Sequence, residues 1–336
     1  MGAELVCGAC GRQHRVNVQE AIVGSGALAE LPAVIARQVG SRRISMLSDE
    51  RTHAVAGARV LTLLAEAGFE VDSLVLASPD EAGHVPVCDD TTRARLSEEL
   101  LEAPCYIAVG SGVISDLTKW VAFDRGAPYV AIATAASMNG YASDNIAPML
   151  RGVKVLLHGR GPVAVIGDLD VLRAAPHEMT AAGLGDVLAK SVSSADWRLN
   201  QLLFGEYFCS FCAGLIDEIE PIYMGKPEAI GRQTAAGIEA LFEGLIYTGL
   251  AMSMAGTSAP ASGGEHLISH TLDMMAARDS IGHDLHGRQV GVGTLLGAAL
   301  YAEIAALDRP VFAVPDDLMA DPGCWGRFTD VVEEKF

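Results

Sequence analysis

The sequence predicts an α/β protein in which a Rossmann-like parallel sheet with crossover helices comes first and an all-helical domain follows. Three observations support this. Short apolar runs alternate with helical patterns through the first half, these strand-like runs stop near Pro176, and long stretches rich in Ala, Leu, Glu and Met come after them. Because 336 residues are enough for two domains, we expect a sheet domain over 1–173 and a helical domain over 174–336, packed around one cleft.

Five runs in the first half are expected to form strands of one sheet. Each is short and rich in β-branched or other apolar residues, and helical patterns separate them, which is typical of parallel strands. They are RRISMLS near 42–48, VDSLVLA near 71–77, CYIAVG at 105–110, PYVAIAT at 128–134 and PVAVIGD at 162–168. Between the last two, MLRGVKVLLHGRGP carries a glycine-rich turn and is expected to add a hairpin.

Composition excludes several classes of function. Half of the residues are apolar and 20% are charged, as in globular proteins. A net charge of −18 without a Lys/Arg cluster argues against binding to nucleic acid. The most apolar stretch, 244–256, is shorter than the roughly 20 residues of a membrane-spanning helix, so we expect no membrane insertion. The N-terminus lacks an apolar signal core, and seven cysteines are an odd set, which indicates reduced thiols in the cytoplasm.

A glycine pair marks a possible phosphate-binding turn. In AVGSGVISDLTKW, Gly110 and Gly112 follow an expected strand and precede an expected helix. Backbone amides at such a helix N-terminus can hold a pyrophosphate. The motif lacks the full spacing of a dinucleotide fingerprint. Glycine-rich turns between a strand and a helix are also common for purely structural reasons.

Asp49 is a second candidate for the cofactor. It stands at the end of the first strand-like run, where an acidic residue can accept hydrogen bonds from ribose hydroxyls. A helical pattern follows it, so for an isolated Asp the role of helix N-cap is favoured. The two roles can coexist.

The helical half contains candidate metal ligands. Asp186 lies in a small, apolar helical stretch, and His266 and His286 follow much later. One carboxylate with two imidazoles is an ordinary ligand set for a catalytic divalent metal with open coordination positions. The spacing leaves alternatives open, because His270 stands four residues after His266 and His283 lies close to His286.

Two CxxC pairs complicate the choice of metal site. Cys7 and Cys10 are followed by His14, which resembles half of a zinc site, and the other pair is Cys209 and Cys212. The pairs are nearly two hundred positions apart in unrelated contexts. We therefore expect neither a shared structural zinc nor a redox role.

Taken together, several motifs resemble the sn-glycerol-1-phosphate dehydrogenase family, within the group of glycerol dehydrogenases, iron-dependent alcohol dehydrogenases and dehydroquinate synthase. They run through nearly the whole chain in one order, and the opening CGACGRQH resembles the bacterial branch. The motifs are DERTHAVAG, VGSGVISDLTKW, PYVAIATAASMNGYAS, DLDVLRAAPHEMTAAGLGDVLAK, PASGGEHLISH and HGRQVGVGTL. The resemblance implies a dehydroquinate synthase-like fold, an NAD(P) cofactor, one divalent metal (zinc first, with nickel or iron possible) and homo-oligomers.

The resemblance also implies roles for individual residues. The family's metal ligands correspond to Asp186, His266 and His286. Asn139 and His270 are expected beside them in the catalytic site, with His270 as a possible proton donor. The expected cofactor-binding residues are Asp49, Gly110, Ser111, Gly112, Asp116, Thr134, Ser137 and Ser143.

Three departures from the family bear on the substrate and on the extent of the chain. Asn139 stands where the family usually has Asp, which keeps hydrogen bonding but loses a charge. Ala259 stands where the family usually has Arg before PASG, which removes a bidentate donor for phosphate. The chain ends at VVEEKF, short of the family's usual C-terminal helices, so we expect an incomplete helical domain.

The implied reaction is the reversible reduction of dihydroxyacetone phosphate to sn-glycerol 1-phosphate, a small polyol phosphate. A dehydroquinate synthase-like cyclase, a polyol dehydrogenase with a changed substrate and a non-catalytic nucleotide-binding relative are the alternatives. The cyclase needs more basic residues than these segments offer, since Lys190 is the main candidate. The three retained ligand positions favour catalysis over binding alone.

Overall fold

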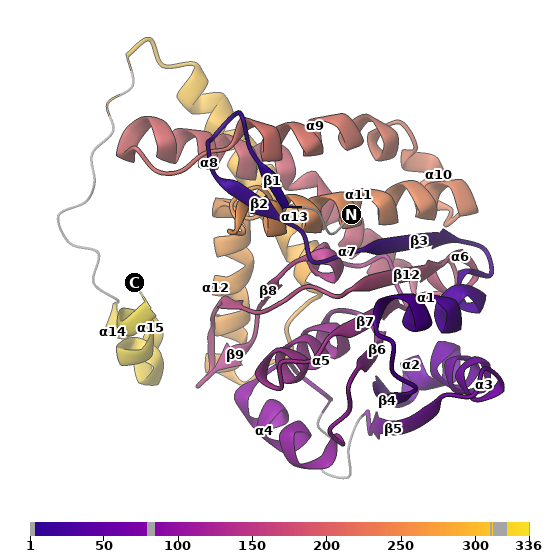
Figure 1. The fold of residues 1–336 in the computed structure, drawn as a ribbon. Coiled ribbons are helices and arrows are strands. Elements are labelled where there is room, and N and C mark those ends of the chain that lie inside the picture. The colour runs from indigo at the N-terminus through magenta and orange to yellow at the C-terminus, as the bar shows by residue number, and fades with distance from the viewer. Residues whose placement is uncertain (1–3, 79–84, 310, 312–320, 336) are drawn as a thin grey trace.

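A computed structural model describes residues 4–78, 85–309, 311 and 321–335. Its centre is a parallel six-stranded sheet in the order β3-β12-β7-β6-β4-β5 (Figure 1). The strands are β3 (Glu20–Gly24), β4 (Arg43–Asp49), β5 (Glu70–Leu76), β6 (Tyr106–Gly110), β7 (Tyr129–Ala133) and β12 (Ala164–Asp168). The five strands expected from the sequence are confirmed, and β3 is an additional edge strand.

Helices cover both faces of this sheet. Strands alternate their side chains between the two faces, so that Ile107 packs on one side and Ala108 on the other. Residues of α1 and α3 cover the face of Ile107, while α5 and the long helix α11 (Ala235–Ala255) of the second half cover the face of Ala108. The helices of the first half are α1 (Leu31–Gln38), α2 (Glu50–Thr52), α3 (Ala58–Glu66), α4 (Asp90–Glu99) and α5 (Gly112–Asp124), with η1 (Ala27–Glu30), η2 (His53–Gly57) and η3 (Gly140–Ala142).

The described residues beyond Pro176 form helices and connecting segments without a strand, which confirms the expected helical half. α11 is long and apolar enough to cross a membrane by length and composition, but 72% of its most apolar window is buried inside the fold, so here it is a core helix. The helices are α6 (Leu169–Leu172), α7 (His177–Leu188), α8 (Lys190–Phe204), α9 (Ser210–Met224), α10 (Pro227–Gly231), α11 (Ala235–Ala255), α12 (Gly264–Asp279), α13 (His286–Ala305), α14 (Pro322–Trp325), η4 (Gly326–Phe328) and α15 (Thr329–Lys335).

Short antiparallel pairs surround the sheet. β9 (Met149–Leu150) pairs with β10 (Val153–Lys154) through a turn in which Arg151 and Gly152 have positive φ, which confirms the expected hairpin. β8 (Asn145–Ile146) pairs with β11 (Leu157–His158).

An N-terminal hairpin was not expected. β1 (Glu4–Val6) pairs with β2 (Gln13–Arg15), and this hairpin lies over the helical half rather than beside the sheet (Figure 1). Part of the expected sheet domain, 1–173, therefore packs on the other half of the chain.

Glycines bring two helices of the second half unusually close together. A methyl group on Gly287 of α13 would overlap the carbonyl oxygen of Ala182 in α7, and one on Gly185 would overlap the carbonyl of Gly287. Only glycine permits this contact. The approach places the first residue of α13, His286, beside the helix that carries Asp186.

Candidate active site

Three helices bring Asp186, His266 and His286 together. Asp186 lies near the end of α7, His266 in the first turn of α12, and His286 begins α13. One ligand atom from each lies within 4.8 Å of the others, and His266 Nε2 is 3.4 Å from Asp186 Oδ1. Asp186 and His266 are buried. The structure thus brings together the three ligands that the resemblance implied.

Neighbouring polar groups fix the orientation of both imidazoles. His266 Nδ1 lies 2.8 Å from Glu265 Oε1, which also accepts the amide of Gly263. Ser269 Oγ donates to Gln289 Oε1 and lies 3.0 Å from His286 Nδ1. Since a hydroxyl carries one proton, His286 must donate to Ser269. Each ring therefore carries its proton on Nδ1 and leaves Nε2 as the ligand atom.

Asp186 is held by two further contacts. The backbone amide of Asn139 donates to Asp186 Oδ2 at 2.7 Å, and Lys190 Nζ donates to the carbonyl of Asp186 at 3.1 Å. Asp186 Oδ1 is fully buried and accepts no hydrogen bond from the described residues. A buried carboxylate oxygen without a partner is costly, so its place in the group with His266 and His286 fits a bound cation.

The charges of the site shift the pKa values of its groups. Burial opposes ionisation of Asp186, but the contact with His266 and the charge of Lys190 outweigh it and lower the pKa to about 2. Burial disfavours protonation of His266, yet Asp186 and Glu265 outweigh this effect and raise its pKa. Burial and the neighbouring His266 lower the pKa of His286 to about 3. Asp186 is thus a carboxylate and His286 a neutral imidazole at neutral pH, as metal ligands must be.

The donor set fits a divalent metal. One carboxylate oxygen and two imidazole nitrogens are acceptable to zinc, nickel or iron. All three side chains are oriented before a metal binds, because Asn139, Glu265 and Ser269 already hold them.

The two other candidate histidines lie outside this group. The ring of His270, one turn after His266, lies with its centroid 5.7 Å from that of His286. His283 is more than half exposed and contacts Asp273 instead. His270 lines the neighbouring cavity and remains a candidate for proton transfer, not a ligand.

A cavity of about 410 Å³ adjoins the metal-ligand group through His270. None of the described residues that line it is a Lys or Arg, and Ala259, where the family usually has Arg, belongs to its wall. The lining residues are Val155, Leu156, Ser193, Asp196, Trp197, Asn200, Ser258, Ala259, Ser262, Gly263, Gly264, Leu267 and His270.

The expected phosphate-binding turn has the predicted geometry. Gly110 ends β6, Ser111 precedes α5, and Gly112 is its first residue. The Ser111 side chain makes no capping hydrogen bond to α5. A methyl group added at Gly112 would have only Met138 within 4 Å among the described residues. Thr134 follows the adjacent strand β7 and donates its amide to the carbonyl of Gly110. The turn therefore lies at the carboxyl edge of the sheet, where α/β proteins bind ligands.

Asp49 and Asp116 both have structural contacts. Asp49 caps α2 by accepting the amide of Thr52, so the favoured N-cap role is confirmed, and the ribose role stays a prediction. Asp116 accepts from the buried Lys119 and from the amide of Ala147. Lys119 in turn donates to the carbonyls of Gly140 and Asn145, which fixes the segment after β7.

That segment carries Ser137, Asn139 and Ser143. Ser137 contacts the hydroxyl of Tyr141, and Ser143 Oγ accepts the amide of Asn145. The side-chain nitrogen of Asn139 is buried and has no hydrogen-bond partner among the described residues. Because the backbone amide of Asn139 also holds Asp186, this residue connects the cofactor-side segment to the metal-ligand group.

Sequence reasoning missed the supporting residues. Glu265 directly precedes His266, and adjacent helix residues do not normally face each other, so helical spacing does not suggest this contact. Ser269 of α12 contacts His286 and Gln289 of α13, so both contacts join separate helices. Likewise, nothing local in the sequence indicates that the amide of Asn139 reaches Asp186.

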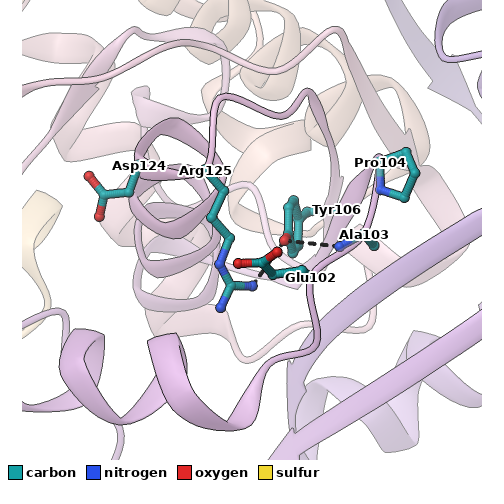
Figure 2. A pocket seen from close by; sticks show the side chains of 6 residues that line it. All are labelled: Glu102, Ala103, Pro104, Tyr106, Asp124 and Arg125. Carbon is teal, nitrogen blue, oxygen red and sulfur yellow. Dashed lines mark hydrogen bonds between the residues drawn. The ribbon is translucent and has the colours of Figure 1, made fainter.

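A second hollow lies far from this chemistry (Figure 2). Figure 2 shows that Glu102, Arg125 and Tyr106 line it at the start of β6, whereas Gly110 is at the strand's other end. The Arg125 guanidinium already donates to Tyr106 Oη and to the carbonyls of Leu100 and Ser97. Because the Arg125 guanidinium is already hydrogen-bonded within the fold, we assign no ligand to this hollow.

Comparisons with known proteins identify relatives of this chain. Residues 22–176 match the iron-containing alcohol dehydrogenase family. The chain is 35% identical over 297 residues to glycerol-1-phosphate dehydrogenase [NAD(P)+] of Bacillus licheniformis, covering 88% of this chain and 73% of that protein. The protein of that name from Pyrococcus furiosus is 34% identical, covering 84% of this chain and 78% of that protein.

Solved structures share the fold. A probable glycerol dehydrogenase from Sinorhizobium meliloti 1021 superposes with a TM-score of 0.66 at 22% identity, over 86% of this chain and 79% of that chain. The sulfoacetaldehyde reductase of Bifidobacterium kashiwanohense, solved in complex with NAD+, gives a TM-score of 0.64 at 18% identity, over 85% and 76% of the two chains. At these identities the likeness establishes the α/β-plus-helical architecture alone.

Proposed function

Since this chain belongs to the glycerol-1-phosphate dehydrogenase family, we propose that it reduces dihydroxyacetone phosphate to sn-glycerol 1-phosphate with NADH or NADPH, and catalyses the reverse oxidation. One observation carries the proposal: three pre-oriented side chains suited to a metal, two of them buried and His286 partly buried, converge beside a cavity. The N-terminal half places a glycine turn at the carboxyl edge of its sheet to receive the cofactor.

Residues of the sheet domain are assigned to the cofactor. The amides of Gly110, Ser111 and Gly112 receive the pyrophosphate at the start of α5, where the helix dipole favours negative charge. Asp49 at the end of β4 accepts hydrogen bonds from the ribose. The nicotinamide and phosphate path is assigned to Thr134, Ser137 and Ser143, and Asp116 positions this path through Lys119.

The metal, zinc or alternatively nickel or iron, is assigned to Asp186, His266 and His286. When bound, it supplies a Lewis acid for the substrate carbonyl, and the reduced nicotinamide supplies the hydride. Glu265 and Ser269 hold the two imidazoles, and the amide of Asn139 holds the carboxylate. His270, at the cavity wall, holds the proton that the product oxygen takes up.

A second candidate substrate is favoured by the wall of the cavity. The described lining contains the carboxylate of Asp196 and no Lys or Arg, whereas a phosphate group is usually bound by cationic donors. A small uncharged ketone, such as dihydroxyacetone, would suit that lining. The reaction class and the site remain the same in this alternative.

One assay distinguishes these substrates. Metal-loaded protein is mixed with NADH or NADPH and either dihydroxyacetone phosphate or dihydroxyacetone, and the loss of nicotinamide absorbance is followed. Turnover of the phosphate alone supports the first proposal, and turnover of dihydroxyacetone alone supports the second. Turnover of neither, with cofactor and metal bound, would contradict both.

Further assignments belong to the same proposal. We assign residues 1–173 to cofactor binding and 174–336 to metal binding, with a homo-oligomer as the working form in the cytoplasm. Neither nucleic acid nor a membrane is part of the proposed activity. The net charge of −18 supports the first exclusion.

A further inference from the structure

Two cysteine pairs that are far apart in the sequence meet in space. Cys7 and Cys209, separated by 202 positions, have their sulfur atoms 3.7 Å apart. His14 Nε2 lies 3.5 Å from Cys10 Sγ and 3.4 Å from Cys209 Sγ. One donor atom of each of these four residues lies within 4.8 Å of all the others. The expectation that the pairs are unrelated is therefore wrong, because the N-terminal hairpin folds onto the start of α9.

The spacing matches a tetrahedral zinc ion. With Zn–S bonds of about 2.3 Å and Zn–N bonds of about 2.0 Å, neighbouring ligand atoms lie roughly 3.5 to 3.8 Å apart. The three distances above fall in or next to that range. The 3.7 Å between the sulfur atoms of Cys7 and Cys209 is much longer than the S–S bond of about 2.05 Å in a disulfide. All described cysteines are free thiols.

The backbone is shaped to present these donors. The amide of Cys7 donates to the carbonyl of Arg12, and the amide of Gly11, at φ +72°, donates to the carbonyl of Cys7. This tight turn directs Cys7 and Cys10 to one side. Cys209 is the N-cap residue of α9, and its carbonyl accepts the amide of Ala213. Three of the donors are nearly inaccessible: Cys7 is 3% exposed, His14 1% and Cys209 0%.

The first strand of the hairpin buries little apolar surface. Leu5 and Val6 of β1 are 43% and 74% exposed. An isolated two-stranded hairpin is marginally stable in water. Its contacts with the helical half include the packing of β2 on α11, the stacking of His14 on Phe211 and of the Arg12 guanidinium on Tyr207. A metal bond between the hairpin and α9 would add to this stabilisation.

We propose that Cys7, Cys10, Cys209 and His14 bind a structural Zn²⁺ ion that fastens the N-terminal hairpin to the helical domain. Soft thiolate donors with one imidazole suit zinc, and four protein ligands leave no position for substrate, which marks a structural site. Cys212 lies beside the group, with its sulfur 3.7 Å from His14 Nε2, but the proposed ligand set is the four donors that lie within 4.8 Å of one another. This site is distinct from the Asp186 group and does not depend on the proposed reaction.

The test measures zinc per chain by mass spectrometry after extensive dialysis, using the His266→Ala variant to empty the other site. We expect one zinc per chain in His266→Ala and none when Cys7→Ser and Cys10→Ser are added. The control Cys324→Ser, a thiol remote from the cluster, keeps its zinc. Equal zinc in all variants, or none in His266→Ala, would overturn the proposal.

Two further measurements guard against misfolded variants and fix the fourth ligand. In folded His266→Ala protein, titration with an organomercurial should release the zinc as thiols are blocked, and cobalt substitution should give thiolate-to-cobalt charge-transfer absorption. Cys212→Ser should keep this absorption, and His14→Ala should lose or shift it. The reverse pattern would overturn the assignment of His14, and no release of zinc would overturn the site.

Discussion

The two donor clusters of this protein differ in almost every respect that matters for chemistry. Asp186, His266 and His286 come from three helices and offer one oxygen and two nitrogens. The other cluster, Cys7, Cys10, His14 and Cys209, comes from a hairpin and the start of one helix and offers mainly sulfur. The first adjoins a cavity through His270, while the second is enclosed by aromatic side chains such as Tyr207 and Trp197.

In the roles proposed for them, the two clusters separate a catalytic metal ion from a structural one within one fold. In the helical cluster, groups such as Glu265 and Ser269 fix the ligands, so that three donors can be held rigidly with positions left for substrate. In the cysteine cluster, the donors come from two parts of the chain, and a tetrahedral zinc ion would connect those parts. The predictions below test this contrast, from the largest expected effect to the smallest.

His266→Ala should remove the metal of the helical cluster and nearly all activity. Loss of a Lewis acid worth about 4 kcal/mol or more in the transition state corresponds to a decrease in kcat of roughly 10³-fold or more. Metal content and the rate of nicotinamide oxidation provide the measurement. The exposed His283→Ala is the control and should keep both. An active His266→Ala enzyme would contradict the assignment.

Ser269→Ala should weaken metal binding or activity by about 10- to 100-fold, because His286 loses the acceptor that fixes its tautomer. A metal titration followed by activity measures the shift. Ser194→Ala is a matched control, since the buried hydroxyl of Ser194 has no partner among the described residues. Identical affinities in both variants would show that Ser269 does not orient the ligand.

Gly287→Ala should destabilise the protein by about 1 to 3 kcal/mol, because the added methyl group would force α13 away from α7. Denaturant unfolding gives the free energy, and metal content should fall with it as His286 moves from Asp186. Gly214→Ala in α9 is the control, because nothing lies near its new methyl group. That variant should be more stable by about 0.5 to 1 kcal/mol; equal effects would refute the close approach.

Lys190 should give a small, pH-dependent contribution. Burial lowers its pKa from 10.5 to about 8, although Asp186 and Glu265 act in the opposite direction. Between pH 8 and pH 10.5 the unfolded chain then binds more protons than the folded one, so this term makes the folded state more stable as the pH rises. Denaturation midpoints at pH 8 and pH 10 should differ less in Lys190→Met than in the wild type. An unchanged difference would contradict the shift.

Much of the sheet followed from the sequence, because buried parallel strands read as short apolar runs. β4, β5, β6, β7 and β12 were all expected. β3 was not, since its residues Glu20–Gly24 are only half-buried at the sheet edge and carry a weak apolar signal. The N-terminal hairpin was missed for a related reason, because its stability depends on partners about two hundred residues away.

The site shows the same limit. The spacing of the histidines did not show which of them bind the metal, because His270 lies four residues after His266 and His283 lies close to His286. The choice depends on where α13 begins relative to α7, which Gly185 and Gly287 determine through a contact between distant segments. The cysteine pairs were judged unrelated on sequence distance alone, although a chain can bring any two of its segments together at modest entropic cost.

Joining of the hairpin to α9 also has a consequence for synthesis on the ribosome. Cys7 cannot meet Cys209 until 202 more residues have been added, which takes about 10 to 40 s at roughly 5 to 20 residues per second. During this interval Cys7 and Cys10 of the nascent chain lack their partner at the start of α9. The hairpin can therefore reach its final position only after α9 has been made, and the proposed zinc site requires its thiols to stay reduced until then.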